Sequence, residues 1–539
     1  MLNLWYKNAV LYCLDVDSFR DSDGDGVGDF RGLADSLDHI EALGATCIWL
    51  LPFYPSPNRD NGYDITDYYN VDPRYGTLGD FVEFMQAAQD RGLRVIVDLV
   101  VNHTSIDHPW FQASRAGDPN YKDWYVWSKD KPADAESGIV FPGVQKTTWT
   151  RDAKRGEYYF HRFYKHQADL NIDNPAVREE IERIMGFWLA LGVSGFRIDA
   201  VPFLIEGLTE ADGSRDPHRY LSEMRQFLAW RKAEAILLAE ANIPMDEADD
   251  YFGSGDRMNL IFNFPLNQRL FLSLARREAE PVKNMLKSLP DIAHVGQWAT
   301  FLRNHDEIDL GRLNDEERQE VFAAFGPERS MQLYDRGIRR RLAPMLGGDR
   351  NRLANAFALM LALPGTPVIW SGDEIGMGDN LELKERDAVR TPMQWTAGES
   401  GGFSSAARAD LVRLPPADGP YAPLHVNAES QRMVDGALLT TVEHLIRIRR
   451  ACREIGWGDY EVLDLEAPSV VGLRCRWRGG EVVTLHNLSE HPATVDLTGI
   501  VEPDKVRHLI GQETDLAEDG ARCVVRLGAY GFDWMRVTG

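Results

Sequence analysis

Short apolar runs alternate with helix-like segments through the first 370 residues of the chain. The helix-like segments end at glycine and carry apolar residues every three to four positions, as at 33–43, 78–91 and 175–191. The apolar runs that predict strands fall at 10–16, 46–51, 194–199, 236–240, 259–263, 299–303 and 367–370, and a further run from Arg94 ends in Asn102-His103. Strands that alternate with helices form parallel sheets, so the pattern predicts an α/β fold, a (β/α)8 TIM barrel.

The alternation breaks at two places along the chain. Residues 105–167 are rich in Trp, Tyr, Phe, Asp and Lys without a helical period, which predicts a domain inserted after the third strand. After a helix near 438–450 the chain turns to short β runs, which predict a small antiparallel β-sandwich. The predicted domains are a catalytic barrel at 1–104 and 168–452, an insert at 105–167, and a C-terminal sandwich at 453–539.

A polar segment between Asp306 and Asn351 contains a cluster of basic residues, Arg336 to Arg341. We expect this segment to be helical and to lie beside the rim of the barrel.

Several candidate strands deliver polar groups at their carboxyl ends. In a barrel of parallel strands these ends share one rim, where catalytic groups sit. Arg197 and Asp199 lie on the same side of their strand, and the cation favours an ionised carboxylate that can attack a sugar carbon. One such group alone could merely cap a strand, but a set of them on one rim predicts an active site. The set comprises His103, Asp199, Glu240, His305 and Asp306.

Composition narrows the function further. The net charge of −24 argues against nucleic acid or an anionic membrane face as a partner, whereas a neutral ligand or a cation fits. The five cysteines, at 13, 47, 452, 475 and 523, have no paired spacing, which predicts buried free thiols in a reducing compartment. The first residues lack a basic region followed by an apolar one, and no run of 18 apolar residues occurs. We therefore expect a cytoplasmic protein.

The stretch from Asp21 to Asp29 has the character of a loop that binds a hard cation. Oxygen-bearing side chains alternate with glycines that permit a tight backbone, but the glutamate at the twelfth position of an EF-hand is missing. An acidic, solvated turn is the alternative interpretation.

Four regions of the chain together resemble the signature regions of the α-amylase family of glycoside hydrolases, in order and each on the expected strand. They are Asp98 to His103, Gly195 to Ala200, Glu240, and Asn304-His305-Asp306. The likeness extends from Trp5-Tyr6 to the C-terminal strands. It implies a (β/α)8 barrel with a domain inserted after strand three, and retaining chemistry on α-glucosidic bonds.

The resemblance implies a role for each carboxylate. Asp199 would be the nucleophile and Glu240 the group that first donates and then accepts a proton, about 5–5.5 Å apart in a retaining enzyme. Asp306 would stay ionised and fix the sugar hydroxyls. His103 and His305 would donate hydrogen bonds to the sugar.

Further residues are expected to shape the sugar pocket. Tyr63 could stack on a sugar face and Asp64 could accept from its hydroxyls. Arg390 resembles the family's arginine that pairs with this aspartate and closes the pocket around the non-reducing end. Together with Arg197, these residues complete the predicted substrate-binding set.

The resemblance also implies a structural calcium ion and no organic cofactor. Its ligands would be Asp21, Asp23, Asp25, Asp29 and the carbonyl of Val27. A second calcium site would use Asn102 and Asp169, with Glu206 nearby.

Within the family the resemblance is strongest to members that interconvert maltose and trehalose. It is carried by stretches at 102–111, 166–177, 239–242, 337–344, 372–380 and 390–395. We expect intramolecular transfer of glucose on a small disaccharide substrate, with minor hydrolysis. An exo-acting α-glucosidase or another disaccharide transglucosidase stays open, as does a homo-oligomer. The intact Asp199, Glu240 and Asp306 disfavour a non-catalytic binding subunit.

Overall fold

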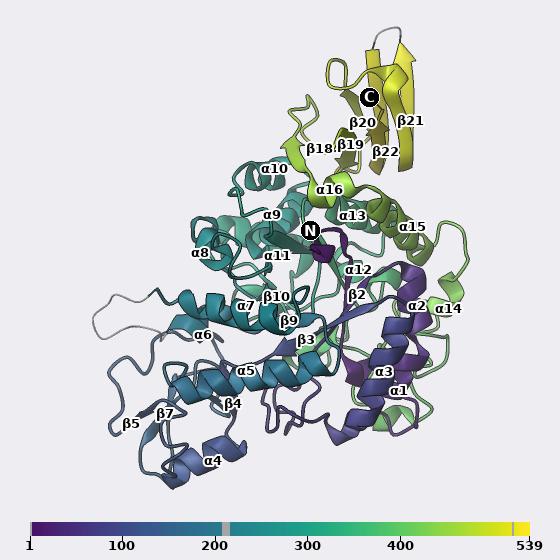
Figure 1. The fold of residues 1–539 in the computed structure, drawn as a ribbon. Coiled ribbons are helices and arrows are strands. Elements are labelled where there is room, and N and C mark those ends of the chain that lie inside the picture. The colour runs from purple at the N-terminus through teal and green to yellow at the C-terminus, as the bar shows by residue number, and fades with distance from the viewer. Residues whose placement is uncertain (1–2, 207–215, 520–521, 539) are drawn as a thin grey trace.

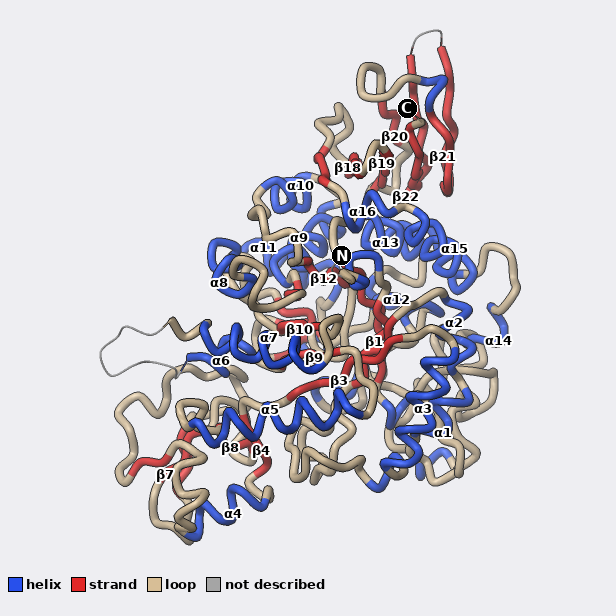
Figure 2. The backbone as a smooth tube through the Cα atoms, in the orientation of Figure 1, coloured by secondary structure: helices blue, strands red, loops and turns tan. Residues whose placement is uncertain are grey.

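The computed structural model, which describes residues 3–206, 216–519 and 522–538, is organised around a closed barrel of parallel strands (Figures 1 and 2). Around the barrel the strands are β1 (Leu11–Leu14), β16 (Thr366–Trp370), β12 (Gln297–Phe301), β11 (Leu260–Phe262), β10 (Ile236–Ala239), β9 (Gly195–Ile198), β3 (Arg94–Leu99) and β2 (Cys47–Leu50). The first and last strands close the ring, with Leu11 opposite Val368. Each predicted strand is a barrel strand, so the predicted (β/α)8 barrel is confirmed.

Helices connect the barrel strands and follow the last of them. They are α1 (Phe30–Asp35), α2 (Leu37–Leu43), α3 (Leu78–Asp90), α5 (Pro175–Ala190), α6 (Val201–Glu206), α7 (Arg219–Arg231), α8 (Ala248–Phe252), α9 (Phe264–Arg276), α10 (Glu280–Lys287), α11 (Asp315–Phe325), α12 (Leu342–Met345), α13 (Arg350–Ala362), α14 (Ala428–Gln431), α15 (Leu438–Ala451) and α16 (Arg453–Trp457). A capping box of Thr77 and Asp80 starts α3, and Asn174 caps α5 ahead of Pro175. The predicted helix at 33–43 is divided, because Ser36 leaves helical geometry between α1 and α2.

The alternation of side chains along each strand divides the core into two parts. Leu11 and Cys13 point into the barrel, where they pack with Trp49 and residues of the other strands. Tyr12 and Leu14 point outward against the helices. All five cysteines are buried, and Cys13, Cys47, Cys452 and Cys475 are free thiols, as the sequence predicted.

The insert after β3 forms a body of its own beside the barrel (Figure 2). Strands β4 (His103–Ser105) and β8 (Gln167–Asp169) pair where the chain leaves and re-enters the barrel. Between them lie α4 (Pro109–Ala116) and a sheet of β5 (Trp127–Ser128), β7 (Tyr158–Phe160) and β6 (Trp149–Arg151).

The polar segment after β12 is helical only in part, in α11 and α12. The basic residues Arg336 to Arg341 are not helical: a small antiparallel sheet of β13 (Ile308–Asp309), β15 (Gly337–Ile338) and β14 (Gln332–Leu333) occupies this part of the rim. Tyr334 and Asp335 adopt the left-handed conformation and turn the chain between β14 and β15, which excludes a helix there.

The C-terminal strands, predicted to form an antiparallel β-sandwich, are antiparallel as predicted and belong to one connected sheet. They are β17 (Asp459–Val462), β18 (Val470–Trp477), β19 (Gly480–Asn487), β20 (Ala493–Asp496), β21 (Val506–Asp519) and β22 (Arg522–Val537). The long β22 pairs with β20 through its first half and with β19 through its second. No helix within the described ranges has the length and apolar character needed to cross a bilayer.

Candidate active site

A cavity of about 540 Å³ opens at the carboxyl ends of the barrel strands. This volume lies within the roughly 300–1,000 Å³ of small-molecule pockets. The cavity brings together Asp199 after β9, Glu240 after β10 and Asp306 after β12, so the three predicted catalytic carboxylates face one space. Tyr63 and His103 line the same space.

Arg197 bridges the catalytic carboxylates from below the cavity floor. Its guanidinium lies 2.5 Å from Asp199, 2.6 Å from Glu240 and 3.4 Å from Asp98. Asp98 is itself held by the Tyr63 hydroxyl at 2.7 Å. Arg197 is buried and does not line the cavity. In this position Arg197 orients the carboxylates, and its predicted contact with substrate stays a prediction.

The residue after the nucleophile is held in an uncommon backbone conformation. Ala200 has a φ of 50°, in the left-handed region that residues with a side chain rarely adopt. In this conformation its amide donates a hydrogen bond of 3.1 Å to Glu240. The turn therefore presents Asp199 to the cavity and helps to orient the acid/base.

The protonation states of the three carboxylates differ. Burial raises the pKa of Glu240 to about 7, against the attraction of Arg197, so Glu240 can carry a proton near neutral pH. Burial also raises the pKa of Asp199, opposed by Arg197. For Asp306, burial acts in the same direction, but Arg386 and Arg390 hold its pKa well below the usual range. One protonated acid beside ionised carboxylates suits retaining cleavage of a glycosidic bond.

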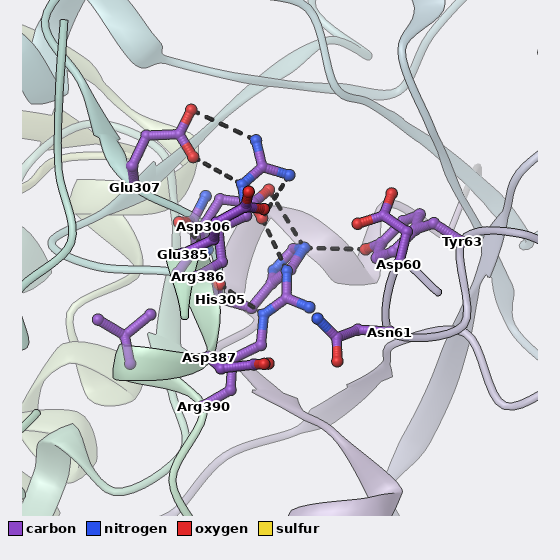
Figure 3. A network of polar contacts seen from close by, with 12 residues as sticks. Asp60, Asn61, Tyr63, His305, Asp306, Glu307, Glu385, Arg386, Asp387 and Arg390 are labelled. Atoms are coloured by element: carbon purple, nitrogen blue, oxygen red, sulfur yellow. Dashed lines mark hydrogen bonds and ion pairs between the residues drawn. The ribbon is translucent and has the colours of Figure 1, made fainter. Parts of the chain in front are cut away.

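The two histidines are neutral hydrogen-bonding groups. Burial lowers the pKa of His103 to about 4, and its Nε2 lies 3.0 Å from the carbonyl of Tyr63. Burial likewise lowers the pKa of His305 well below its usual value. The His305 ring lies behind the cavity lining, stacked on Tyr63, with its Nε2 at 2.8 Å from the Tyr63 hydroxyl and 3.3 Å from Asp306 (Figure 3).

The expected pair of Asp64 and Arg390 is not formed, and this prediction is corrected. Asp64 is fully buried and accepts hydrogen bonds from the Ser56 hydroxyl and from the amides of Arg59 and Asp60. Arg390 instead donates to the His305 carbonyl at 2.8 Å and to Asp306 at 2.9 Å. Neither residue lines the cavity.

Asp60 and Arg386 occupy the cavity wall in their place (Figure 3). The turn at Asn61 and Gly62, both in the left-handed conformation, separates Asp60 from Asp64 and turns only Asp60 toward the cavity. Burial raises the pKa of Asp60 to about 7, and Arg386 is the first of the cations that oppose this shift. The sequence contains both aspartates in one stretch, and only the turn distinguishes them.

A roof over the cavity joins the insert to the rim, and the sequence did not single out its residues. We define this roof as Phe141, Tyr164, Tyr334, Glu385 and Arg386. The Tyr164 hydroxyl lies 3.0 Å from both the Tyr334 hydroxyl and Glu385. The Phe141 ring lies 4.7 Å from that of Tyr334, and the Arg386 guanidinium lies over Phe141. Arg386 also contacts Asp306 at 3.2 Å, which ties the roof to the catalytic floor.

The acidic loop places three of its aspartates together. Carboxylate oxygens of Asp21, Asp23 and Asp29 all lie within 4.8 Å of one another. Asp25 is outside this group, and its carboxylate accepts from the amide of Val27 at 2.8 Å. Within the described ranges none of these four aspartates forms an ion pair, so their negative charge is not compensated by a side chain.

The residues of the expected second cation site are only partly brought together. Asn102 donates to Asp169 at 3.2 Å. Glu206 is half exposed, and its carboxylate is bound by Arg162 at 2.5 Å. Glu206, expected near this site, is thus held by Arg162, and the second cation site stays a prediction.

Comparison with known proteins covers nearly the whole chain. The model of the family described as "Alpha amylase, catalytic domain" matches residues 14–324 and 335–458, and that of "Sucrose hydrolase-like, C-terminal domain" matches residues 479–536. The chain is 41% identical to the trehalose synthase/amylase TreS of Mycobacterium tuberculosis, over 99% of this chain and 90% of that protein. It is 43% identical to the trehalose synthase of Thermus thermophilus, over 92% of this chain but 51% of that longer protein.

Solved structures agree with these matches. The trehalulose synthase MutB from Pseudomonas mesoacidophila MX-45 superposes with a TM-score of 0.77 at 27% identity, covering 99% of each chain. The isomaltulose synthase PalI from Klebsiella sp. LX3 superposes with a TM-score of 0.79 at 26% identity, also over 99% of each chain.

Proposed function

The chain belongs to the α-amylase family, and on that basis we propose that it is an intramolecular glucosyltransferase that interconverts maltose and trehalose, with hydrolysis as the minor outcome. Its relatives named trehalose synthases share 40–43% identity over nearly the full chain. Together with the intact Asp199, Glu240 and Asp306, these relatives disfavour a non-catalytic binding role.

The cavity residues perform the transfer in two displacements. Asp199 attacks the anomeric carbon of maltose, and its ester forms as the bond to the leaving oxygen breaks, while Glu240 gives that oxygen its proton. The released glucose then turns so that its anomeric hydroxyl faces the ester. Glu240 removes the proton of that hydroxyl, the 1,1 bond forms, and Asp199 leaves with the configuration retained. Asp306, ionised throughout, holds the sugar hydroxyls.

The roof is the observation that favours transfer over hydrolysis. Glucose must stay in the cavity while it turns, and water must be kept from the ester. Phe141 and Arg386 of the roof line the cavity, and beside them Tyr164 of the insert contacts Tyr334 and Glu385 of the rim. A covering of this kind retains the small acceptor, whereas an open pocket would exchange it for water.

A digest of maltose tests the proposal. We expect trehalose as the main product, free glucose as the minor one, and maltose as the product when trehalose is supplied. Isotope-labelled glucose added to the mixture should enter trehalose poorly, because the transferred acceptor never leaves. Chromatography that finds only glucose would overturn the proposal in favour of an α-glucosidase, and efficient uptake of the label would indicate an intermolecular transglucosidase.

We further propose that the acidic loop binds a structural calcium ion. Three carboxylates within reach of one another, without a paired cation, match the oxygen donors that calcium takes. Asp21, Asp23 and Asp29 would hold the ion, with the carbonyl of Val27, and the ion would fix the loop after β1. Metal analysis of the purified protein by mass spectrometry tests this proposal.

A cytoplasmic location is also proposed. It is supported by the buried free thiols of Cys13, Cys47, Cys452 and Cys475, which are typical of proteins in a reducing compartment. Fractionation of the source cells, followed by detection of the protein with an antibody, tests this assignment.

A further inference from the structure

Arg413 is a buried arginine outside the cavity that joins three separate segments of the chain. Its guanidinium lies 2.7 Å from Asp17, 2.7 Å from Asn61 and 3.0 Å from Asp387. Its side chain is only 5% exposed, so these bonds are largely shielded from water. A planar guanidinium can hold several acceptors at fixed angles, which an ammonium cannot do.

Two of these acceptors are adjacent in the sequence to residues that line the cavity wall. Asn61 directly follows Asp60, and Asp387 directly follows Arg386. Asp60 and Arg386 both line the cavity, on segments that come from opposite ends of the barrel sequence. Figure 3 shows Asp60 and Asn61 on one side of this site and Arg386 and Asp387 on the other. A single cation therefore fixes the two wall segments relative to each other.

The backbone next to Arg413 is itself bound to the acidic loop. The preceding segment packs on the acidic loop, where the Val412 amide donates to the carbonyl of Gly26 at 2.8 Å. Gly26 has a φ of 94°, and a Cβ there would lie 2.1 Å from the carbonyl oxygen of Asp410. This close approach means that Arg413 starts from a fixed position that does not depend on a bound sugar.

We propose that Arg413 is a positioning residue that sets the separation of Asp60 and Arg386, and thereby the affinity for the glucosyl unit and the share of it lost to water. The expected effect on the share of glucose lost to water rests on the proposed function. Without the cation, Asn61 and Asp387 lose their common partner. The wall segments can then move apart, and the sugar is held less firmly over Asp199.

The test compares Arg413→Gln with Arg413→Lys. Because small misplacements at an active site cost up to about 100-fold in rate, we expect Arg413→Gln to lower kcat/KM for maltose by about 10- to 100-fold, mainly through KM. The share of free glucose should rise. Arg413→Lys should recover only part of the loss, since it keeps the charge but not the planar geometry.

Arg449 provides the matched control. It is equally buried, and its guanidinium donates to the carbonyl of Gly365 at 2.8 Å, far from the cavity lining. We expect Arg449→Gln to lower the melting temperature without changing KM or the product ratio. If Arg413→Gln behaves like Arg449→Gln, with a lower melting temperature and unchanged KM and products, the proposal is overturned.

Two single substitutions keep the proposal testable if Arg413→Gln does not fold. Asn61→Ala and Asp387→Ala each remove one cavity-side acceptor of Arg413 and leave its contact with Asp17. Each should raise KM, and unchanged KM in both variants would overturn the proposal. The proposed function fails separately: if the unaltered protein makes no trehalose, KM values for hydrolysis of a chromogenic α-glucoside still test Arg413.

Discussion

The guanidinium of Arg197 lies 2.6 Å from the carboxylate of Glu240. The same cation lies 2.5 Å from Asp199, so the nucleophile and the acid/base share one counter-charge. When Asp199 becomes an ester, its negative charge no longer raises the pKa of Glu240, while the attraction of Arg197 for the Glu240 carboxylate remains. This favours the ionised form of Glu240 at the stage when it must accept a proton.

Replacement of Asp199 by asparagine should abolish turnover of all α-glucosides, because the amide cannot form the covalent ester. We expect a fall of about 10⁴-fold or more in kcat. Circular dichroism and thermal melting should show that the fold is kept. Asp98→Asn is the matched control, since Asp98 also contacts Arg197 but does not line the cavity. Residual activity well above background in Asp199→Asn would mean that another group is the nucleophile.

The pH profile should report the protonation of Glu240. Burial raises the pKa of this carboxyl to about 7, and the first step needs its proton. kcat/KM should therefore be lost as the pH rises through about 7, falling up to tenfold for each further pH unit. Asp306 should add no change there, because its pKa lies well below the usual range. The assignment is contradicted by a profile that stays flat from pH 6 to 9, or by an identical alkaline limb in Glu240→Gln.

Asp60→Ala and Arg386→Ala should weaken binding of the disaccharide, since each removes a polar group from the cavity wall: Asp60 accepts a hydrogen bond from Gln167 at 2.8 Å, and Arg386 lies 3.2 Å from Asp306. The expected cost is about 2–5 kcal/mol in kcat/KM. Asp64→Ala, only four residues from Asp60, should act differently: Asp64 is fully buried among hydrogen-bond donors, so its loss should lower the melting temperature with little change in KM. Steady-state kinetics and melting curves of the three variants separate the two roles, and a larger KM effect in Asp64→Ala would reverse our assignment.

Tyr334→Ala should open the roof and raise the proportion of glucose among the products of maltose. Tyr334→Phe removes only the hydroxyl that meets Tyr164 and keeps the ring beside Phe141. We expect a smaller rise in this variant. Quantitative chromatography of both digests against the unaltered protein gives the ratio, and an unchanged ratio in Tyr334→Ala would show that the roof does not exclude water.

Chelation should lower the melting temperature, because an ion that binds only the folded protein stabilises it by about 2.7 kcal/mol at 100 times its Kd. The effect on kcat at 25 °C should be smaller, since the acidic loop supplies no group to the chemistry. Calorimetry with chelator, and again after calcium is restored, measures the shift. In Asp21→Asn the melting temperature should no longer respond to chelator. A melting temperature of the unaltered protein that changes with neither chelator nor calcium would count against the site.

Much of the barrel and its catalytic rim could be predicted from the sequence, for a local reason. Each barrel strand is a short apolar run, and the polar residue that follows it must emerge at the strand's carboxyl end. The position of Asp199, Glu240 and Asp306 on the rim therefore follows from their place in the sequence directly after a strand. Cys13 and Cys47 lie within such runs, and both are buried.

Other features depend on geometry that the residue pattern does not contain. Asp60 and Asp64 flank one turn, and the left-handed conformation of Asn61 and Gly62 decides which of them reaches the cavity. The strands β14 and β15 are two residues long each, too short for an alternating pattern to reveal them. Arg413 joins partners that are up to 396 positions away in the sequence, so no local signal marks it.

The pairing of β1 with β16 also constrains how the protein folds during its synthesis. Leu11, Tyr12 and Cys13 pair with Val368, Ile369 and Trp370, which the ribosome adds about 350 residues later. At about 5–20 residues per second, the first strand waits for roughly 20 to 70 s with one edge unpaired. During translation this edge is open to mispairing with other chains. The yield of correctly folded protein in the cell should therefore depend on chaperones that protect the nascent N-terminal strand.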